Sequence, residues 1–110
     1  MATQPDELLR GTLDALILKT LSWGPRHGYA IARWIEEATG DVLQITEGSL
    51  YPALYRMEER RWVSAEWQRT ESSKRIKVYA LTTRGRAELR NQVAEWDQVV
   101  KAMAKVLRPA

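Results

Sequence analysis

The stretch that decides the fold is residues 46–82, which read TEGSLYPALYRMEERRWVSAEWQRTESSKRIKVYALT. Its first part has the spacing of an amphipathic helix, with a narrow apolar stripe at Leu50, Leu54 and Met57. From Val63 the pattern changes to the alternation of apolar and polar residues that is typical of a strand. A helix followed closely by a hairpin therefore forms the centre of the predicted fold.

The start of this helix can be set in two ways, because Pro52 lacks the amide N–H that a helix interior requires. We expect Thr46 to cap the helix, with Glu47 at the positive end of the helix dipole and a local distortion at Pro52. In the alternative, Ser49 is the cap and Pro52 falls in the first turn, where proline is tolerated.

The hairpin is predicted from two alternating runs on either side of a polar segment. Residues 63–68 alternate between apolar and polar side chains, residues 69–74 are polar and turn-like, and residues 75–81 alternate again. Because Arg69, Lys74 and Arg75 lie at the two ends of this polar segment, we expect a β-hairpin with a basic tip.

Two further helices are predicted upstream. Thr12 can cap the first of them, whose apolar positions are Leu13, Leu16, Ile17 and Leu21. Gly24 and Pro25 end that helix. The second begins near Gly28 and stops at Gly40, with apolar positions at Ile31, Trp34, Ile35 and Ala38.

Downstream, Thr82 can cap a last helix that reaches to about Leu107. The order is helix, helix, helix, hairpin, helix, which predicts a mainly α fold with a small β-hairpin. Residues 1–82 form a winged helix-turn-helix and residues 83–110 a long C-terminal dimerisation helix, within one compact domain. A length of 110 residues suits a single domain of this kind.

Charge is unevenly distributed along the chain. The whole chain has a net charge of +3, but residues 56–90 hold ten Lys or Arg against five Asp or Glu, a net of +5. A focused basic zone is typical of a protein that binds a polyanion, although a solvated basic face without a partner gives the same pattern. There are no cysteines and no apolar segment of signal-peptide or membrane-spanning type, so we expect a soluble cytoplasmic protein.

The third helix and the hairpin supply the side chains that DNA recognition needs. The N-terminal part of a helix in the major groove approaches base edges, and a basic loop beside it contacts the backbone or the minor groove. The candidate DNA-binding residues are Ser49, Tyr51, Tyr55, Arg56, Arg69, Ser73, Lys74 and Arg75. Alternatively, the two tyrosines flank the core, Arg56 joins a surface ion pair with Glu59, and the charges of the tip belong to an ordinary turn.

Four stretches resemble the PadR family of transcriptional regulators, in the family's order. They are LRGTLDALIL at 9–18, GPRHGY at 24–29, EGSLYPAL at 47–54 and YALTTRG at 79–85. The resemblance implies a regulator, usually a repressor, that binds an inverted repeat as a dimer. The sequence departs from the family at Arg61, where glycine is usual after the recognition helix, so this residue must avoid or tolerate a left-handed backbone.

The last helix has a heptad pattern that predicts a dimer. The apolar positions are Leu89, Val93, Trp96, Val100, Met103 and Leu107. From 83 to 107 the helix would be on the order of 37 Å long, which is more than a small winged helix can cover. A partner chain is the simplest cover, although part of the stripe can fold back on Leu8, Leu9 and Leu13.

Trp96 lies in the middle of this pattern. In some drug-responsive PadR-like regulators, a tryptophan at the matching place stacks on flat aromatic ligands between the subunits, so the resemblance suggests Trp96 as a ligand platform for a small aromatic effector. A tryptophan packed in the interface is the alternative that we favour.

Other function classes lack support in the sequence. The single histidine, His27, has no catalytic partner and is expected at a helix start, and no group of residues has the spacing of a metal site. We therefore predict no enzyme activity, no metal, no cofactor and no membrane partner. The main alternative is a winged-helix module for protein–protein contact, which would not need a basic hairpin tip.

Overall fold

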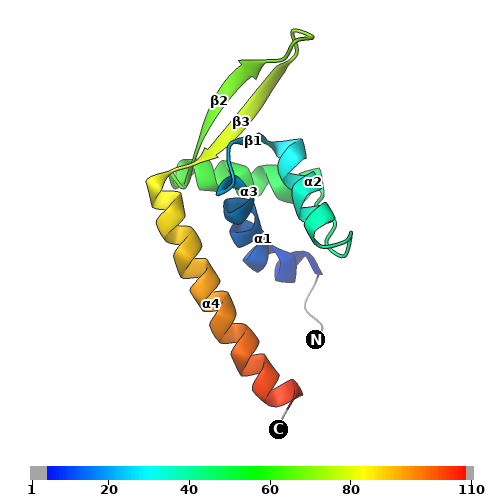
Figure 1. Ribbon diagram of the computed structural model, residues 1–110, viewed down its shortest axis with the longest axis vertical. Helices are drawn as coiled ribbons and strands as arrows, with labels where there is room; N and C mark the ends of the chain where they lie inside the picture. Colours follow the sequence, from blue (N-terminus) through cyan, green and yellow to red (C-terminus); the bar gives the residue numbers. More distant parts are fainter. Residues whose placement is uncertain (1–4, 109–110) are drawn as a thin grey trace.

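The computed structural model describes the backbone of residues 5–108 and the side chains of residues 12–108. Its elements, in chain order, are α1 (Pro5–Leu21), β1 (Arg26–His27), α2 (Gly28–Ala38), α3 (Glu47–Glu59), β2 (Val63–Arg69), β3 (Arg75–Leu81) and α4 (Thr83–Leu107). The strands form an antiparallel sheet in the order β1-β3-β2. The β2–β3 hairpin rises from one end of a helical body, and α4 leaves that body in the opposite direction (Figure 1).

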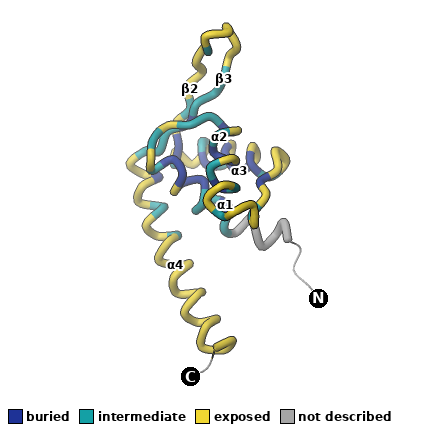
Figure 2. The backbone as a smooth tube through the Cα atoms, turned by 45° about the vertical axis from the view of Figure 1, so that its right-hand side comes forward, coloured by how far each residue is buried: buried dark blue, intermediate teal, exposed yellow. Residues whose placement is uncertain are grey.

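The hydrophobic core lies among the first three helices. Ile17 and Leu18 of α1 are fully buried with Ile31 of α2 and Leu54 of α3. Buried residues gather in this region, whereas the hairpin tip and most of α4 are exposed (Figure 2). Val63 and Tyr79 at the base of the hairpin join the same cluster, so the wing is anchored in the core.

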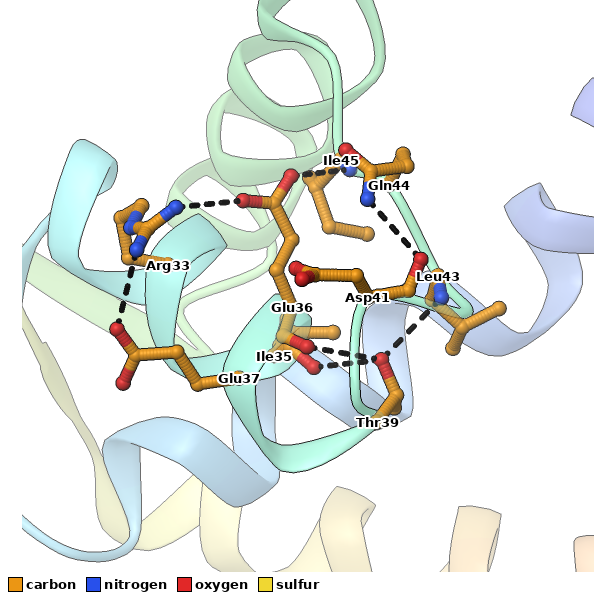
Figure 3. A network of polar contacts seen from close by, with 9 residues as sticks. All are labelled: Arg33, Ile35, Glu36, Glu37, Thr39, Asp41, Leu43, Gln44 and Ile45. Carbon is orange, nitrogen blue, oxygen red and sulfur yellow. Dashed lines mark hydrogen bonds and ion pairs between the residues drawn. The ribbon is translucent and has the colours of Figure 1, made fainter.

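The turn between α2 and α3 is held by polar contacts (Figure 3). Gly40 has a φ of 58°, and the amide of Asp41 donates to the Glu36 carbonyl, a Schellman end to α2. The Glu36 carboxylate accepts from the amide of Ile45 at 3.0 Å, and Thr39 Oγ1 accepts from the amide of Leu43 at 3.2 Å. Side chains of α2 thus bind the segment that leads into α3 and fix the helix-turn-helix.

The start of α3 matches the favoured interpretation. Thr46 is the N-cap, and its Oγ1 accepts from the amide of Ser49 at 3.2 Å. Pro52 lies inside the helix, which continues through it to Glu59, so the alternative with Ser49 as the cap is not adopted.

Arg61 adopts the left-handed backbone in place of the family's glycine, with a φ of 61°. The amide of Arg61 donates to the Glu58 carbonyl at 3.1 Å, and the amide of Trp62 donates to the Met57 carbonyl at 2.9 Å. This is again a Schellman motif, and its hydrogen bonds hold a non-glycine residue in a conformation that costs backbone energy.

The start of α4 is joined to the end of α3 through Trp62. Thr82 caps α4 by accepting from the amide of Gly85 at 3.0 Å, as predicted. The amide of Thr82 also donates to the Trp62 carbonyl at 3.1 Å. Gly85 is buried against the same carbonyl, where a Cβ would overlap the oxygen.

The fold class is confirmed, and two details differ from the sequence analysis. Thr12 is not a cap, because α1 already begins at Pro5 and Thr12 lies within it. The two-residue strand β1 was not predicted, because it is defined only by its pairing with Val78 and Tyr79. The side chains of Leu8 and Leu9 lie outside the described residues.

Candidate nucleic-acid interface

One side of α3 is buried and the other is open. Leu50, Leu54 and Met57 face the core, as the apolar stripe predicted. Tyr51 and Tyr55 are exposed on the opposite side, with Pro52 and Glu59. Both predicted tyrosines therefore lie on the solvent side of the helix.

Tyr51 also packs against the start of α2. A Cβ on Gly28 would come within 2.8 Å of the Tyr51 hydroxyl, so the absence of a side chain at Gly28 makes room for the ring. His27 precedes this glycine as the N-cap of α2, and its Nδ1 accepts from the amide of Ala30 at 3.2 Å. His27 thus has the structural place at a helix start that the sequence predicted.

Ser49 is partly engaged in the N-cap of α3. Its amide donates to Thr46 Oγ1, and its hydroxyl oxygen accepts from the same hydroxyl at 3.1 Å. The Ser49 hydroxyl hydrogen remains available at the N-terminal end of α3.

Arg56 makes an intramolecular ion pair across to α1. Its Nη2 lies 2.9 Å from Asp14 Oδ1, and the side chains are 36% and 14% exposed respectively. Burial raises the pKa of the Asp14 carboxyl, and the charges of Arg56 and Arg60 oppose that shift. The sequence analysis placed Arg56 on DNA or, alternatively, beside Glu59. The partner that the structure gives it is Asp14, so Arg56 braces α3 against α1.

The wing tip is a closed turn that carries basic side chains. The amide of Thr70 donates to the Lys74 carbonyl at 2.9 Å, and the amide of Ser73 donates to the Thr70 carbonyl at 2.9 Å. Ser73 has a φ of 64°. Arg69 and Arg75 face each other where the strands meet this turn, and Arg69, Ser73, Lys74 and Arg75 are all exposed.

One face of the wing has a feature that the sequence analysis did not single out. Trp67 is 57% exposed, and the Arg75 guanidinium lies 4.8 Å from the indole centroid. Lys77 Nζ lies 5.9 Å from the same ring and 3.0 Å from Glu58 Oε1 of α3. That hydrogen bond raises the pKa of Lys77. The alternation of residues in the sequence assigned Trp67 to one face of the hairpin, but no sequence pattern indicated that cations lie close to its ring.

The α4 stripe is the second exposed surface. We define it as Val93, Trp96, Val99, Val100, Met103, Val106 and Leu107, all of which are exposed. Val99 and Val106 were not in the predicted heptad pattern and widen it. Leu89, which was predicted in the pattern, is partly buried against the chain's own core. The beginning of α4 is therefore covered within the chain, and the rest is not.

No group of three or more His, Cys, Asp or Glu residues that could hold a metal ion occurs in the described part of the chain. In the same residues, no helix combines the length and the apolar character that crossing a membrane requires.

These elements define a class of protein. A helix-turn-helix with an exposed third helix, a basic β-wing beside it and a long last helix is a winged helix-turn-helix regulator. Residues 17–91 match the PadR-like family of transcriptional regulators, and the chain belongs to that family. It is a DNA-binding transcriptional regulator and not an enzyme.

Solved structures show the same architecture. A transcriptional regulator from Clostridium thermocellum has a TM-score of 0.86 and 28% identity, over 93% of this chain and 99% of that one. A PadR family transcriptional regulator from Eggerthella lenta has a TM-score of 0.80 and 32% identity, over 94% and 88%. A protein of Mycobacterium tuberculosis named a probable transcriptional regulator is 34% identical over 83 residues, which span 76% of this chain and 44% of that protein.

Proposed function

We propose that this chain is a cytoplasmic repressor that binds a palindromic operator as a homodimer held together by α4. The observation that carries the proposal is the α4 stripe, whose members remain exposed although they are large and apolar. A monomeric protein seldom leaves so continuous an apolar surface in water, and a second copy of the same helix would cover it. A two-fold dimer presents two recognition helices, which suits an inverted repeat.

The proposed contacts to DNA divide between α3 and the wing. Ser49, Tyr51 and Tyr55 lie at the N-terminal end and on the exposed side of α3, where a helix in the major groove meets bases and phosphates. Arg69, Ser73, Lys74 and Arg75 would hold the flanking backbone. Arg56 supports these contacts from behind, because its guanidinium already donates to Asp14. In this proposal residues 1–82 bind DNA and residues 83–110 form the dimer.

Two measurements test the central claim. Purified protein is mixed with fragmented genomic DNA, and the fragments that stay bound are sequenced. We expect an enriched inverted repeat upstream of a gene, whose reporter is repressed when the protein is present. Sedimentation of the free protein at micromolar concentration should give a dimer. A monomer that nevertheless binds a palindrome tightly would contradict the role of α4.

A single substitution tests whether dimerisation supports DNA binding. Val100→Glu puts two carboxylates close to the two-fold axis of the proposed dimer, where burial makes charge costly. We expect a monomer whose operator affinity falls by far more than one surface contact explains, because the two heads no longer bind as one unit. Gln98→Glu adds the same charge to another face of α4 and should keep both the dimer and the affinity.

Trp96 has two possible roles in such a dimer. In the first, it packs in the interface between the α4 helices. In the second, a small aromatic effector stacks on it, as the exposure of the ring in the single chain permits. Titration of a planar aromatic dye into the dimer separates the two roles. Saturable binding that disappears in Trp96→Ala, with the dimer intact, supports the effector site, and its absence leaves the packing role.

A further inference from the structure

Trp67 is a large apolar side chain that the wing leaves exposed. Antiparallel pairing places Trp67 opposite Lys77 and Arg69 opposite Arg75. Directly opposed residues share a face of the hairpin, and diagonal neighbours lie within reach of an aromatic ring. Arg75 is the diagonal neighbour of Trp67, which is why its guanidinium can reach to within 4.8 Å of the indole centroid. We define the wing cluster as Trp67, the two cations near its ring, Arg75 and Lys77, and Arg69 on the same face.

The wing cluster is tied to the recognition helix. Lys77 Nζ lies 3.0 Å from the carboxylate of Glu58 in α3, 5.6 Å from the ring centroid of Tyr79 and 5.9 Å from that of Trp67. The charge of Lys77 is thereby engaged within the protein. Arg75 has no such carboxylate among the ion pairs of the described residues, so its charge is offset only by the face of the ring.

The charge of this face indicates what it binds. Glu58 offsets the charge of Lys77, whereas Arg69 and Arg75 belong to none of the ion pairs of the described residues. Alternation puts Glu66, which precedes Trp67 in the chain, on the other face, opposite Val78. An exposed surface with concentrated positive charge, next to the exposed side of α3, complements the phosphates that flank a groove-bound helix.

We propose that Trp67 is a positioning residue for DNA binding, which holds the Arg75 guanidinium ready for a backbone phosphate. A long arginine side chain on a strand loses rotamer entropy when it binds, and stacking on a rigid indole removes part of that cost beforehand. Trp67 thus acts through Arg75 and adds no base contact of its own. The proposal rests on the proposed DNA binding and goes beyond it, because it assigns a role to a residue that bears no charge.

The test measures the affinity of the dimer for the duplex enriched by genomic selection and for a random duplex of the same length, over a series of KCl concentrations. The variants are Trp67→Leu, Trp67→Phe, Arg75→Ala and the double variant Trp67→Leu/Arg75→Ala. Trp23→Leu is the matched control, because Trp23 is 64% exposed and lies under Lys19 Nζ at 5.1 Å, but is outside the wing.

We expect Trp67→Leu to weaken both duplexes by about two- to fivefold per wing, the range of an exposed cation–π contact. Trp67→Phe should recover most of the affinity, and Trp23→Leu should bind as the wild type does. Arg75→Ala should make the salt dependence shallower by about 0.9 for each phosphate that the protein no longer neutralises. The double variant should bind no more weakly than Arg75→Ala alone.

A second readout does not depend on DNA. The side-chain protons of Arg75 should show an upfield ring-current shift in NMR spectra of the free protein, and this shift should vanish in Trp67→Leu while the thermal transition stays close to that of the wild type. A Trp67→Leu variant that binds like the wild type overturns the proposal. So does a weakening that persists undiminished in the Arg75→Ala background, because the ring would then contact DNA or another protein itself. If the wild type binds neither duplex, the proposed function fails, and the role of Trp67 fails with it.

Discussion

At the residue scale, two turns of the same design carry different residues. Gly40 and Arg61 both follow a helix in a Schellman motif, with φ values of 58° and 61°. Glycine adopts this conformation without strain, whereas an L-residue with a side chain loses about 1–2 kcal/mol. The hydrogen bonds of the motif hold Arg61 in this conformation, and its strain lowers the free energy of unfolding of the chain.

The first prediction places glycine at position 61 and a residue with a side chain at position 40. Arg61→Gly should raise the free energy of unfolding by about 0.5–1 kcal/mol, because relief of the left-handed strain exceeds the added freedom of the unfolded chain. Gly40→Ala is the matched variant and should lower it, although nothing lies within 4 Å of the new Cβ. Urea unfolding of both variants measures the two effects. Equal signs would show that the left-handed angle is not what matters at these positions.

The second prediction concerns the pH dependence of the Asp14–Arg56 pair. Burial raises the pKa of Asp14 above its ordinary 3.8, so the folded chain holds this proton more tightly than the unfolded chain. The contribution of this protonation to the free energy of unfolding is fully present below the ordinary pKa of Asp14. It is lost as pH rises through the pKa that Asp14 has in the folded chain. Arg56→Met removes the opposing positive charge, moves the pKa of Asp14 higher and enlarges that loss.

We therefore expect Arg56→Met to cost about 1–2 kcal/mol at pH 7 and less near pH 4. Unfolding in urea at both pH values measures the difference. Arg90→Met is the control, because Arg90 is exposed on α4 and belongs to none of the ion pairs of the described residues, so its loss should cost little at either pH. A deficit for Arg56→Met that is the same at both pH values would mean that the ionisation of Asp14 is not involved.

At the element scale, the start of α4 depends on close backbone approach. Gly85→Ala would force a Cβ into the Trp62 carbonyl, which belongs to the backbone and has little room to move. We expect a loss of about 1–3 kcal/mol, the usual cost of overpacking, or a shift of α4. Gly48→Ala should instead stabilise by up to about 1 kcal/mol, since its Cβ meets only Thr46 Oγ1 at 3.9 Å within a helix. Thermal unfolding of the two variants compares the sites.

The same scale explains what could be predicted from the sequence. The spacing of apolar residues and the capping residues of helices are properties of short sequence segments. For this reason α3, both long strands and α4 were predicted close to their observed bounds. Pairing is not local. β1 exists only through its hydrogen bonds to β3, and Asp14 is 42 residues from Arg56. The cations over Trp67 depend on hairpin register, and the coverage of Leu89 depends on the path of α4, so neither follows from spacing alone.

At the scale of the whole molecule, the extents are 57 × 28 × 24 Å, and the long axis runs from the wing to the end of α4 (Figure 1). The two proposed functions therefore lie at opposite ends. We predict that Lys74→Ala/Arg75→Ala weakens all duplexes about equally and leaves the dimer intact, because phosphate contacts carry no sequence information. Ser49→Ala should change the preference among sequences instead. DNA selection with each variant measures its sequence preference, and sedimentation measures its oligomeric state. If instead the wing variant changed the sequence preference and Ser49→Ala did not, the assigned roles of the wing and α3 would be reversed.

The Trp62 carbonyl has a mechanical consequence. It accepts from the amide of Thr82 and lies against Gly85, while the amide of the same residue closes the end of α3. The junction between α3 and α4 is thus held by short backbone contacts, and Thr82 Oγ1 also donates to the Arg61 carbonyl at 2.6 Å. A tilt of about ten degrees there moves the far end of a helix roughly 37 Å long by about 6 Å. In the proposed dimer, the angle between α3 and α4 at this junction would set the distance between the two α3 helices, so a change in that angle would alter the spacing of the half-sites that the dimer fits.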